Sequence, residues 1–579
     1  MDRRPLSLPE VLAAIPQKNV WMVDFEYYGE DGERPTPVCL VAYELRSQQT
    51  IQQWYEDFGS EPPYDLSADS LFVAFSVPAE CSCHAVLNWS MPKRVLDLYV
   101  EFKNLVNGLE ERASLLSALA YFGLPTYEQE KTSTRDLILT GGPWTPDEKI
   151  TILDYCHKDV MALNGLLPFL LPTLQSGALL RGRAMVSMAR IEHCGIPIDL
   201  EMRQLFIDRI DEIKEHSISV ANQEFPVFEN GVLKLEKFDK CLVERDMFWP
   251  RTASGRLSLS DSNFEKMIEI YPQVRPLRDA LRIRNNLKLS DVVVGPDGRN
   301  RCSLMPFQSR TGRCQPSNAK FIFGMASWLR GLIKPPPGYG IAYVDFSQQE
   351  IAIAAALSGD PNMIAAYETG DSYLGFAKAA GLVPADATKK SHRIIRDRCK
   401  ACVLGVNYFM AEQSLALRIG QHVIIAKSML DAHKQIYRVY WNWVQNRLHH
   451  AMLEQRVFTV FGWQQHVGHD PNPRQLGNFA MQSHGSEMLR LACAMSTEAG
   501  LSIAAPVHDA ILLLSPLDRL DSDIVLLQKI MRDASAIVLN GFSVRTDPAI
   551  FKYPQRYRPD EEKAKMWDEI TKRLGVSGE

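Results

Sequence analysis

The amino-acid sequence predicts a multidomain α/β protein, and three observations lead to this fold class. The chain has 579 residues, of which 46% are hydrophobic and 23% are charged, so it can bury more than one core. Short apolar strands alternate with helical stretches between residues 20 and about 170. A mostly helical segment to about residue 290 is then followed by mixed strands and helices.

The first α/β region contains four clear elements. Strands are predicted at 20–28 (VWMVDFEYY), 36–45 (TPVCLVAYEL) and 71–77 (LFVAFSV), because each run is apolar and rich in β-branched or aromatic residues. A long amphipathic helix is predicted at 148–171. The prolines and the turn-prone QSGA that follow predict a domain boundary near residue 175.

The rest of the chain contains two aspartates that follow strands. An apolar strand at 341–344 runs directly into Asp345, and a helix begins soon after it. Helices are predicted to continue to about residue 455. The segment 501–516, LSIAAPVHDAILLLSP, has two apolar runs and predicts a β-hairpin with Asp509 at its turn.

Asp345 has two structural explanations and one chemical explanation. Aspartate is favoured where strands end, and Ser347 and Glu350 have the spacing of a capping box for the following helix. Alternatively, Asp345 and Asp509 meet on adjacent strands, where two carboxylates can hold two divalent ions about 4 Å apart for a phosphoryl transfer. Mg²⁺ suits this role, because it binds through one or two carboxylates together with substrate phosphates, and Mn²⁺ is the alternative.

A predicted helix between these aspartates carries four side chains at four-residue spacing: Arg396, Lys400, Leu404 and Tyr408. At about 100° per residue, positions four apart drift by only about 40°, so these side chains share one helix face. A triphosphate can lie along the two cations while the base and sugar lie against Leu404 and Tyr408. The alternative is an amphipathic helix whose cations face water.

Basic residues are concentrated in one stretch of a chain whose net charge is −5 at pH 7. Residues 275–334 contain twelve Lys and Arg residues against three Asp residues. Such a one-sided run suits a groove that binds a nucleic-acid backbone, and a solvated basic face is the alternative.

The cysteine content and the absence of long apolar segments indicate a cytoplasmic protein without membrane contact. The 11 cysteines are odd in number and scattered, as is typical of reduced thiols. Cys81 and Cys83 are predicted to be structural, because no second Cys/His pair with zinc-ligand spacing follows them. No window holds the roughly 18 apolar residues of a spanning helix, and the N-terminus lacks a signal-peptide core.

Three motifs occur in the order of motifs A, B and C of family A DNA polymerases, the DNA polymerase I family: DFSQQE, RDRCKACVLGVNY and VHDA. The segment SRTGRCQPSN (309–318) resembles the T-G-R segment of that family, and RQLGNFAMQSHGSE (474–487) has its R-x-x-x-N-x-x-x-Q spacing. The resemblance covers roughly residues 180–555. It implies a right-hand fold of palm, fingers and thumb, and template-directed DNA synthesis with two Mg²⁺ ions per active site.

The resemblance also implies a role for each matched residue. Asp345 and Asp509 would bind the metal ions, and Arg396 and Lys400 would hold the triphosphate, with Lys400 protonating the leaving pyrophosphate. Leu404 and Tyr408 would lie near the incoming nucleotide, Glu350 would abut the sugar C2′, and primer or template would be contacted by Arg313, Asn478, Gln482 and His508. The chain departs from the family at Leu404, Phe409 and Ala510, where an aromatic residue, Gly and Glu are common.

The N-terminal region carries a second set of acids. Asp24 and Glu26 are two residues apart on a predicted strand and so point to one face. Tyr155 and Asp159 are four apart on the long helix and also share a face. Together they resemble the first and third motifs of DEDD-type 3′–5′ proofreading exonucleases, whose fold is RNase H-like.

The middle motif of such an exonuclease has two candidates. Glu80, in VAFSVPAEC, is preferred because of its position within the motif, and Asp97, in RVLDLYVEF, is the reserve. With Glu80, the resemblance implies four carboxylates that bind two metal ions and a tyrosine, Tyr155, that orients the hydrolytic water.

The predicted organisation is an exonuclease domain at 1–175, a thumb at 176–300, palm at 301–350, fingers at 351–455 and palm again at 456–579. Primer-template DNA and dNTPs are the expected partners of a monomer, and no accessory replication protein is identified. The arrangement looks phage-like, so phage genome replication in the host bacterial cytoplasm is expected. The alternatives are a single-subunit RNA polymerase, which Glu350 disfavours, and a polymerase specialised for DNA in which 2-aminoadenine replaces adenine.

Overall fold

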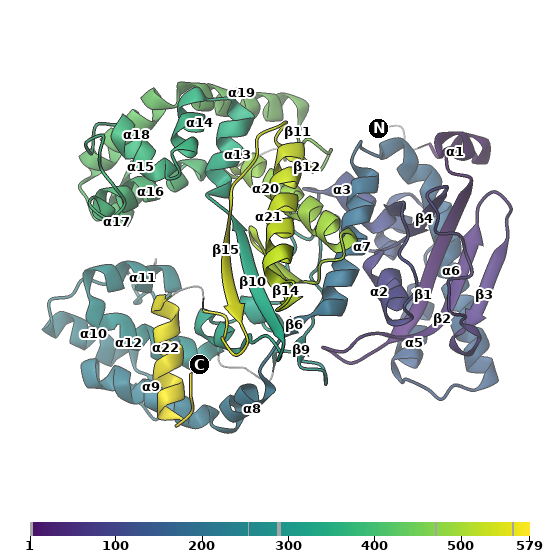
Figure 1. The fold of residues 1–579 in the computed structure, drawn as a ribbon, viewed down its shortest axis with the longest axis horizontal. Helices are drawn as coiled ribbons and strands as arrows, with labels where there is room; N and C mark the ends of the chain where they lie inside the picture. The colour runs from purple at the N-terminus through teal and green to yellow at the C-terminus, as the bar shows by residue number, and fades with distance from the viewer. Residues whose placement is uncertain (1–3, 253, 287–290, 469–471, 559–560, 579) are drawn as a thin grey trace. The chain divides into compact units, whose positions relative to one another are not determined.

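The computed structural model describes residues 4–252, 254–286, 291–468, 472–558 and 561–578, and the chain divides into two compact units (Figure 1). The first unit comprises Met1–Ile196, Ser303–Gln315 and Gly338–Ile550, and the second comprises Pro197–Cys302, Pro316–Pro337 and Phe551–Glu579. The predicted α/β multidomain fold class is confirmed. Among the described helices, none is long and apolar enough to cross a membrane.

The N-terminal part of the first unit is built on a five-stranded sheet in the order β3-β2-β1-β4-β5. Its strands are β1 Asn19–Tyr28, β2 Thr36–Glu44, β3 Thr50–Trp54, β4 Ser70–Ala74 and β5 Val95–Asp97. The first three strands pair antiparallel, whereas β4 runs parallel to β1 and β5 runs parallel to β4. This order and these directions are those of the predicted RNase H-like fold.

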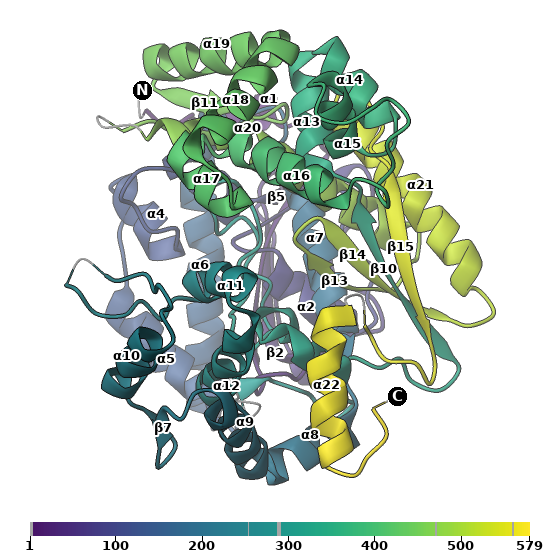
Figure 2. The same cartoon turned by 90° about the vertical axis from the view of Figure 1, so that its left-hand side faces the viewer.

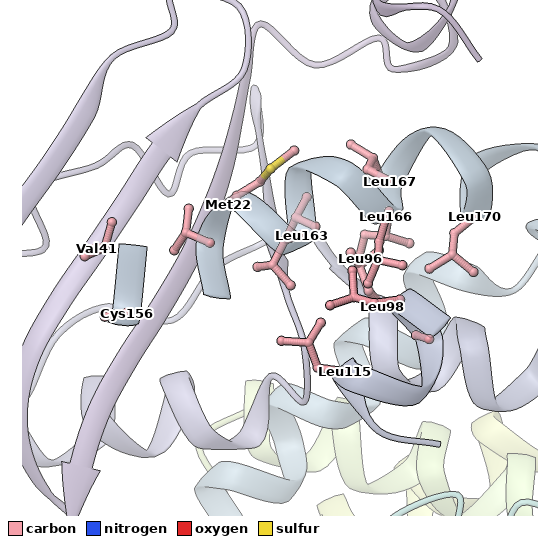
Figure 3. Packing of buried hydrophobic residues seen from close by; sticks show 14 of the residues in the cluster. Met22, Val41, Leu96, Leu98, Leu115, Cys156, Leu163, Leu166, Leu167 and Leu170 are labelled. Carbon is pink, nitrogen blue, oxygen red and sulfur yellow. The ribbon is translucent and has the colours of Figure 1, made fainter. Parts of the chain in front are cut away.

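Helices cover both faces of this sheet. Successive residues of β1 point to opposite faces, and they belong to two different apolar clusters, each of which includes residues of a helix. Met22 belongs to a cluster with α6, in which Leu163 and Leu167 pack (Figure 3). Trp21 belongs to another cluster, which includes Met185 of α7. The helices of this part are α1 Leu8–Ala14, α2 Pro78–Val86, α3 Leu98–Val106, α4 Leu115–Tyr121, α5 Glu128–Leu139, α6 Pro146–Leu170 and α7 Ala178–Cys194.

A domain boundary is predicted near residue 175, but the first compact unit continues to Ile196 because of the contacts of α7. Helix α7 packs against α2 and β5 of the N-terminal part and also against α20 farther along the chain. Its Arg181 forms a buried ion pair with Glu101 of α3, at 2.7 Å from Nε to Oε1. The N-terminal α/β part and the second sheet therefore belong to one compact unit, and the finer domain limits stay a prediction.

The second sheet of the first unit has the order β13-β14-β10-β15. Its strands are β10 Tyr339–Phe346, β13 Ile503–Val507, β14 Ala510–Pro516 and β15 Thr546–Lys552, and helices α20 Pro473–Glu498 and α21 Leu520–Val538 pack against it. The predicted strand at 341–344 and the predicted hairpin at 501–516 are both confirmed. Asp509 lies at the hairpin turn, next to His508, whose φ is 57°.

A group of helices follows β10, each packed against the next (Figures 1 and 2). The helices are α13 Gln349–Ser358, α14 Pro361–Glu368, α15 Ser372–Ala379, α16 Arg393–Asn407, α17 Glu412–Ile419, α18 Val423–Ile436 and α19 Arg438–Glu454. The prediction that helices continue to about residue 455 is confirmed. A short ribbon of β11 Arg456–Phe458 and β12 Gln464–His466 leads on to α20.

The second unit is mostly helical around its own apolar cluster, whose large members include Phe225, Phe238, Trp249 and Phe264. Its helices are α8 Leu200–Asp208, α9 Ile210–Glu224, α10 Leu235–Glu244, α11 Asp261–Ile270, α12 Arg275–Asn286 and α22 Glu561–Arg573. Short strand pairs are made by β7 Phe228–Glu229 with β8 Val232–Leu233, and by β6 Ile196–Pro197 with β9 Arg299–Asn300.

Candidate functional site

Two predicted site residues lie at one end of the second sheet. Strands β10 and β14 are antiparallel, with Asp345 opposite Ala510. The N–H of Phe346 donates to the carbonyl oxygen of Asp509 at 3.1 Å. The structure therefore brings Asp345 and Asp509 to the same end of neighbouring strands.

The carboxylates at this sheet end repel one another. Burial raises the pKa of Asp345 to about 6, and the negative charges of Asp509 and Asp547 add to that effect. Burial also raises the pKa of Asp509, and the positive charges of His508 and Arg313 oppose the shift. Divalent cations would remove this repulsion, and an all-oxygen donor set fits Mg²⁺.

Asp547 of β15 has no counterpart among the residues predicted from the sequence. The hydroxyl of Ser347 donates to its carboxylate, and the N–H of Ser347 donates to the carbonyl oxygen of Arg545 at 2.8 Å. A third carboxylate is thereby held near Asp345. No motif marks Asp547, because its strand becomes a neighbour of β10 only in the folded sheet.

The capping-box explanation of Ser347 and Glu350 is wrong. Gln348 is the N-cap residue of α13, with a φ of 53°, and in this described helix its side chain makes no capping hydrogen bond. The Ser347 hydroxyl is bound to β15, and Oε1 of Glu350 accepts a hydrogen bond from the Tyr408 hydroxyl at 2.9 Å. Glu350 thus joins the first turn of α13 to the end of α16.

Helix α16 presents two cations on one side. The ring centroid of Tyr373 lies 5.2 Å from Cζ of Arg396 and 5.9 Å from Nζ of Lys400, so both cations lie on one face of the helix. Leu404 is partly buried one turn farther on. Tyr408 is the C-cap residue of the helix and keeps 43% of its surface exposed.

Two of the departures from the family have a structural setting. Phe409 has a φ of 52°, a left-handed conformation that favours glycine. A Cβ atom on Gly477 of α20 would lie 2.0 Å from the Phe409 ring, so this ring fills space that only a glycine leaves open. Ala510 is fully buried in the hairpin.

The residues predicted to contact DNA gather around the same sheet end. Asn478 and Gln482 lie one turn apart on α20, and Nε2 of Gln482 is 3.5 Å from the Tyr408 hydroxyl oxygen. Arg313 and His508 are close enough to Asp509 for their charges to lower its pKa against the effect of burial.

A second cluster of acids lies on β1 of the N-terminal sheet. Carboxylate oxygens of Asp24 and Glu26 and the Sγ atom of Cys156 all lie within 4.8 Å of one another. Sγ of Cys156 donates to Oδ2 of Asp24 at 3.4 Å. The two acids predicted to share a face could hold a metal ion, and Cys156 is a neighbour that the motifs did not identify.

Helix α6 brings Tyr155 and Asp159 to this cluster. Burial raises the pKa of Tyr155, and the charges of Asp159, Glu26 and Asp24 raise it further. The hydroxyl of Tyr127 donates to Oδ1 of Asp159 at 2.5 Å. Tyr155 is therefore close to the acids of β1, and Asp159 lies beside Tyr155.

The geometry separates the two candidates for the middle acid. Asp97 accepts hydrogen bonds from the backbone N–H groups of Ser76, Val77, Tyr99 and Val100, so its oxygens cap α3. Glu80 is buried in α2, and its Oε2 has no hydrogen-bond partner among the described residues. Burial raises the pKa of Glu80, and the charge of Asp24 raises it further, so Glu80 lies near Asp24 of β1.

A family model described as DNA polymerase family A matches residues 201–547. The chain belongs to DNA polymerase family A. Among curated members, thermostable DNA polymerase I of Thermus thermophilus is 23% identical over 378 residues, which are 60% of this chain and 44% of the relative. The DNA polymerase of Mycobacterium phage D29 is 26% identical over 263 residues, 44% of this chain and 42% of the relative. The chain thus spans less than half the length of these relatives.

A solved family A structure shares the fold. It is the POL domain of Pol1 from M. smegmatis in complex with DNA primer-template and dNTP, with a TM-score of 0.71 and 16% sequence identity. The likeness covers 95% of this chain and 98% of that one. The predicted fold, an RNase H-like part followed by a right-hand polymerase part, is confirmed.

Proposed function

We propose that this family A chain is a template-directed DNA polymerase that adds dNTPs to a primer 3′-OH. The observation that carries the proposal is the position of Asp345 and Asp509 at one end of adjacent strands. Burial raises the pKa of both carboxylates there, so bound cations would stabilise their charged forms. The primer 3′-OH loses its proton to water as its oxygen attacks the α-phosphate of the dNTP, and the bond to the leaving pyrophosphate breaks. Two Mg²⁺ ions, when bound, stabilise the attacking and leaving oxygens.

The other residues of the site position the nucleotide in this proposal. Asp345 and Asp509 hold the metal ions, and Arg396 and Lys400 bind the triphosphate, with Nζ of Lys400 giving a proton to the pyrophosphate. Glu350, held by the Tyr408 hydroxyl, abuts the sugar C2′ and excludes a 2′-hydroxyl. The position proposed for Glu350 beside C2′ favours a DNA polymerase over the alternative of a single-subunit RNA polymerase.

Primer-template DNA is the proposed partner of the same site. Arg313, Asn478, Gln482 and His508 contact primer or template, and the basic residues of 275–334 neutralise backbone phosphates. In this proposal residues 176–300 form the thumb and residues 351–455 form the fingers. The proposed setting is phage genome replication by a monomer in the host bacterial cytoplasm, which is supported by the similarity to a phage DNA polymerase.

We propose a second activity, 3′–5′ exonucleolytic proofreading, for the N-terminal cluster. Its support is the close pair of Asp24 and Glu26 on β1, with Glu80 of α2 near Asp24 and with Tyr155 of α6 in electrostatic reach of the β1 acids and of Asp159. These carboxylates hold metal ions, and the hydroxyl of Tyr155 orients the attacking water. The family match begins at residue 201, so this activity rests on the geometry of the cluster alone.

A primer-extension assay with Mg²⁺ tests the first activity. We expect template-directed extension with dNTPs and little with rNTPs. Efficient extension with rNTPs would favour the RNA polymerase alternative. A strong preference for 2-amino-dATP over dATP would favour specialisation for DNA that contains 2-aminoadenine, and failure to extend with any nucleotide would contradict the proposal.

A further inference from the structure

Arg396 is held by contacts that the proposed nucleotide site does not explain. Its Nε donates to Oδ2 of Asp371 at 2.5 Å, and its Nη1 donates to Oδ1 of Asp397 at 3.1 Å. Its guanidinium also lies over the buried ring of Tyr373. Only 12% of the Arg396 side chain remains exposed, so its direction is fixed before any ligand binds.

The loop that carries Asp371 is itself tied to the strand of Asp345. Nε2 of Gln348 donates to the carbonyl oxygen of Gly370 at 3.0 Å, and Oε1 of Gln348 accepts from the N–H of Ser372 at 3.0 Å. The Gln348 side chain therefore forms hydrogen bonds with both neighbours of Asp371 in the chain. Gln348 lies three residues after Asp345, so the backbone together with these hydrogen bonds connects Asp345 to the loop of Asp371, whose carboxylate accepts from Arg396.

We propose that Asp371 is a positioning residue that fixes the Arg396 guanidinium toward the triphosphate of the incoming nucleotide, with Gln348 setting its place relative to Asp345. The inference rests on the proposed polymerase function. A guanidinium has five N–H donors, so the two contacts to carboxylates leave further donors for phosphate oxygens. Preorganisation of this kind strengthens binding because less side-chain freedom is lost when the ligand arrives.

Helix capping is the competing explanation of Asp371, and it uses a different oxygen. Oδ1 accepts the N–H of Leu374 as the N-cap of α15, whereas Oδ2 accepts from Arg396. Asparagine keeps an oxygen for the cap but presents an NH₂ group to the guanidinium. Asp371→Asn therefore removes the ion pair and retains the cap.

Asp360 provides a matched control from the same group of helices. It caps α14 by accepting from the N–H groups of Asn362 and Met363, and its Oδ2 accepts from the backbone N–H of Tyr440 rather than from a guanidinium. Asp360→Asn makes the same chemical change at a helix cap without touching Arg396.

Steady-state insertion of a single dNTP tests the inference on the full chain with primer-template and Mg²⁺. Asp371→Asn should raise the KM for dNTP about 10-fold, the worth of a charge-assisted hydrogen bond, and change kcat much less. Gln348→Ala should raise KM by a smaller factor, and Asp360→Asn should leave it unchanged. Asp371→Asn added to Arg396→Ala should cause no further rise, because the carboxylate acts through that arginine.

The outcomes separate this inference from the function on which it rests. An unchanged or lower KM in Asp371→Asn, while Arg396→Ala raises KM, would overturn the positioning role and leave the polymerase function standing. Additive effects in the double variant, or an equal effect of Asp360→Asn, would also overturn it. A wild-type chain that inserts no nucleotide would overturn the proposed function and this inference together.

Discussion

The two carboxylate clusters of the first unit balance their charge in different ways. At the end of the second sheet, the positive charges of Arg313 and His508 act on Asp509. In the N-terminal cluster, the charges that act most on Glu80 and Tyr155 are those of other acids, as are the charges of Asp509 and Asp547 on Asp345. We infer that metal ions would relieve repulsion between carboxylates in both clusters, and that the second site also has a cation of its own chain, Arg313, beside Asp509.

Burial differs between the clusters as well. Glu80 and Asp159 keep only 2% and 6% of their surface exposed, whereas Asp24 and Glu26, like Asp345 and Asp509 at their strand ends, are partly exposed. A strand end leaves room for a large ligand beside the carboxylates.

The buried acid of the N-terminal cluster should be essential for its proposed activity. Glu80→Gln should lower the rate of single-strand digestion from the 3′ end by about 100-fold or more, because a carboxylate that stabilises transition-state charge through a metal ion is lost. Asp97→Asn should retain most of that rate, since Asp97 caps α3. Gel analysis of a labelled single strand measures both. The reverse order of effects would make Asp97 the middle acid.

The Glu350–Tyr408 contact should govern sugar choice at the second site. Glu350→Ala should raise the efficiency of rNTP insertion relative to dNTP insertion by about 10-fold or more, because the proposed wall at C2′ is removed. Glu350→Gln keeps the size and an acceptor for the Tyr408 hydroxyl, so it should change the ratio much less. Single-nucleotide insertion kinetics measure the ratio, and an unchanged ratio in Glu350→Ala would remove Glu350 from sugar selection.

Metal ions in the absence of DNA should stabilise the N-terminal cluster most. Addition of Mn²⁺ to the free protein should raise the melting temperature of the wild type, because an ion that binds only the folded chain stabilises it. This rise should be largely lost in Asp24→Ala with Glu26→Ala and largely kept in Asp345→Ala. Calorimetry with and without EDTA measures the rise. If Asp345→Ala alone lost the rise in melting temperature caused by Mn²⁺, the second-sheet site and not the N-terminal cluster would be the main metal site of the free protein.

The buried cap Asp97 should give the smallest effect, a dependence of stability on pH. Burial raises the pKa of Asp97 from its ordinary value of 3.8 to about 7 in the folded chain. The folded chain therefore binds this proton more tightly, and the wild type should lose stability relative to Asp97→Asn as pH rises from about 4 to about 7. Above about pH 7 the difference should be constant. Melting temperatures of both proteins across this range are the check, and a flat difference would contradict it.

The sequence predicts elements well where local patterns dominate. The strand before Asp345 and the hairpin around Asp509 follow from apolar runs and a turn, and α6 follows from its helical period. Motif order also selects most of the residues that the structure gathers at each cluster. Family membership, confirmed by the match over residues 201–547, could likewise be inferred from three short motifs.

The remaining features depend on contacts that local patterns do not contain. Asp547 becomes a site residue through the pairing of β15 with β10, which are separated by some 200 residues of chain. The spacing of Ser347 and Glu350 predicts a capping box, but bonds to β15 and to Tyr408 take both side chains. Position within the motif favours Glu80 over Asp97, and the hydrogen bonds that make Asp97 the cap of α3 add a distinction that the motif does not contain.

The most direct test of two independent carboxylate sites uses one mismatched primer-template, the wild type and two variants. Asp345→Ala should lower extension by about 10³-fold or more and leave removal of the mismatched 3′ nucleotide intact, because it removes a metal ligand of one site only. Asp24→Ala with Glu26→Ala should stop that removal and leave extension from a matched primer intact. Loss of both activities in either variant, or of neither, would contradict the account.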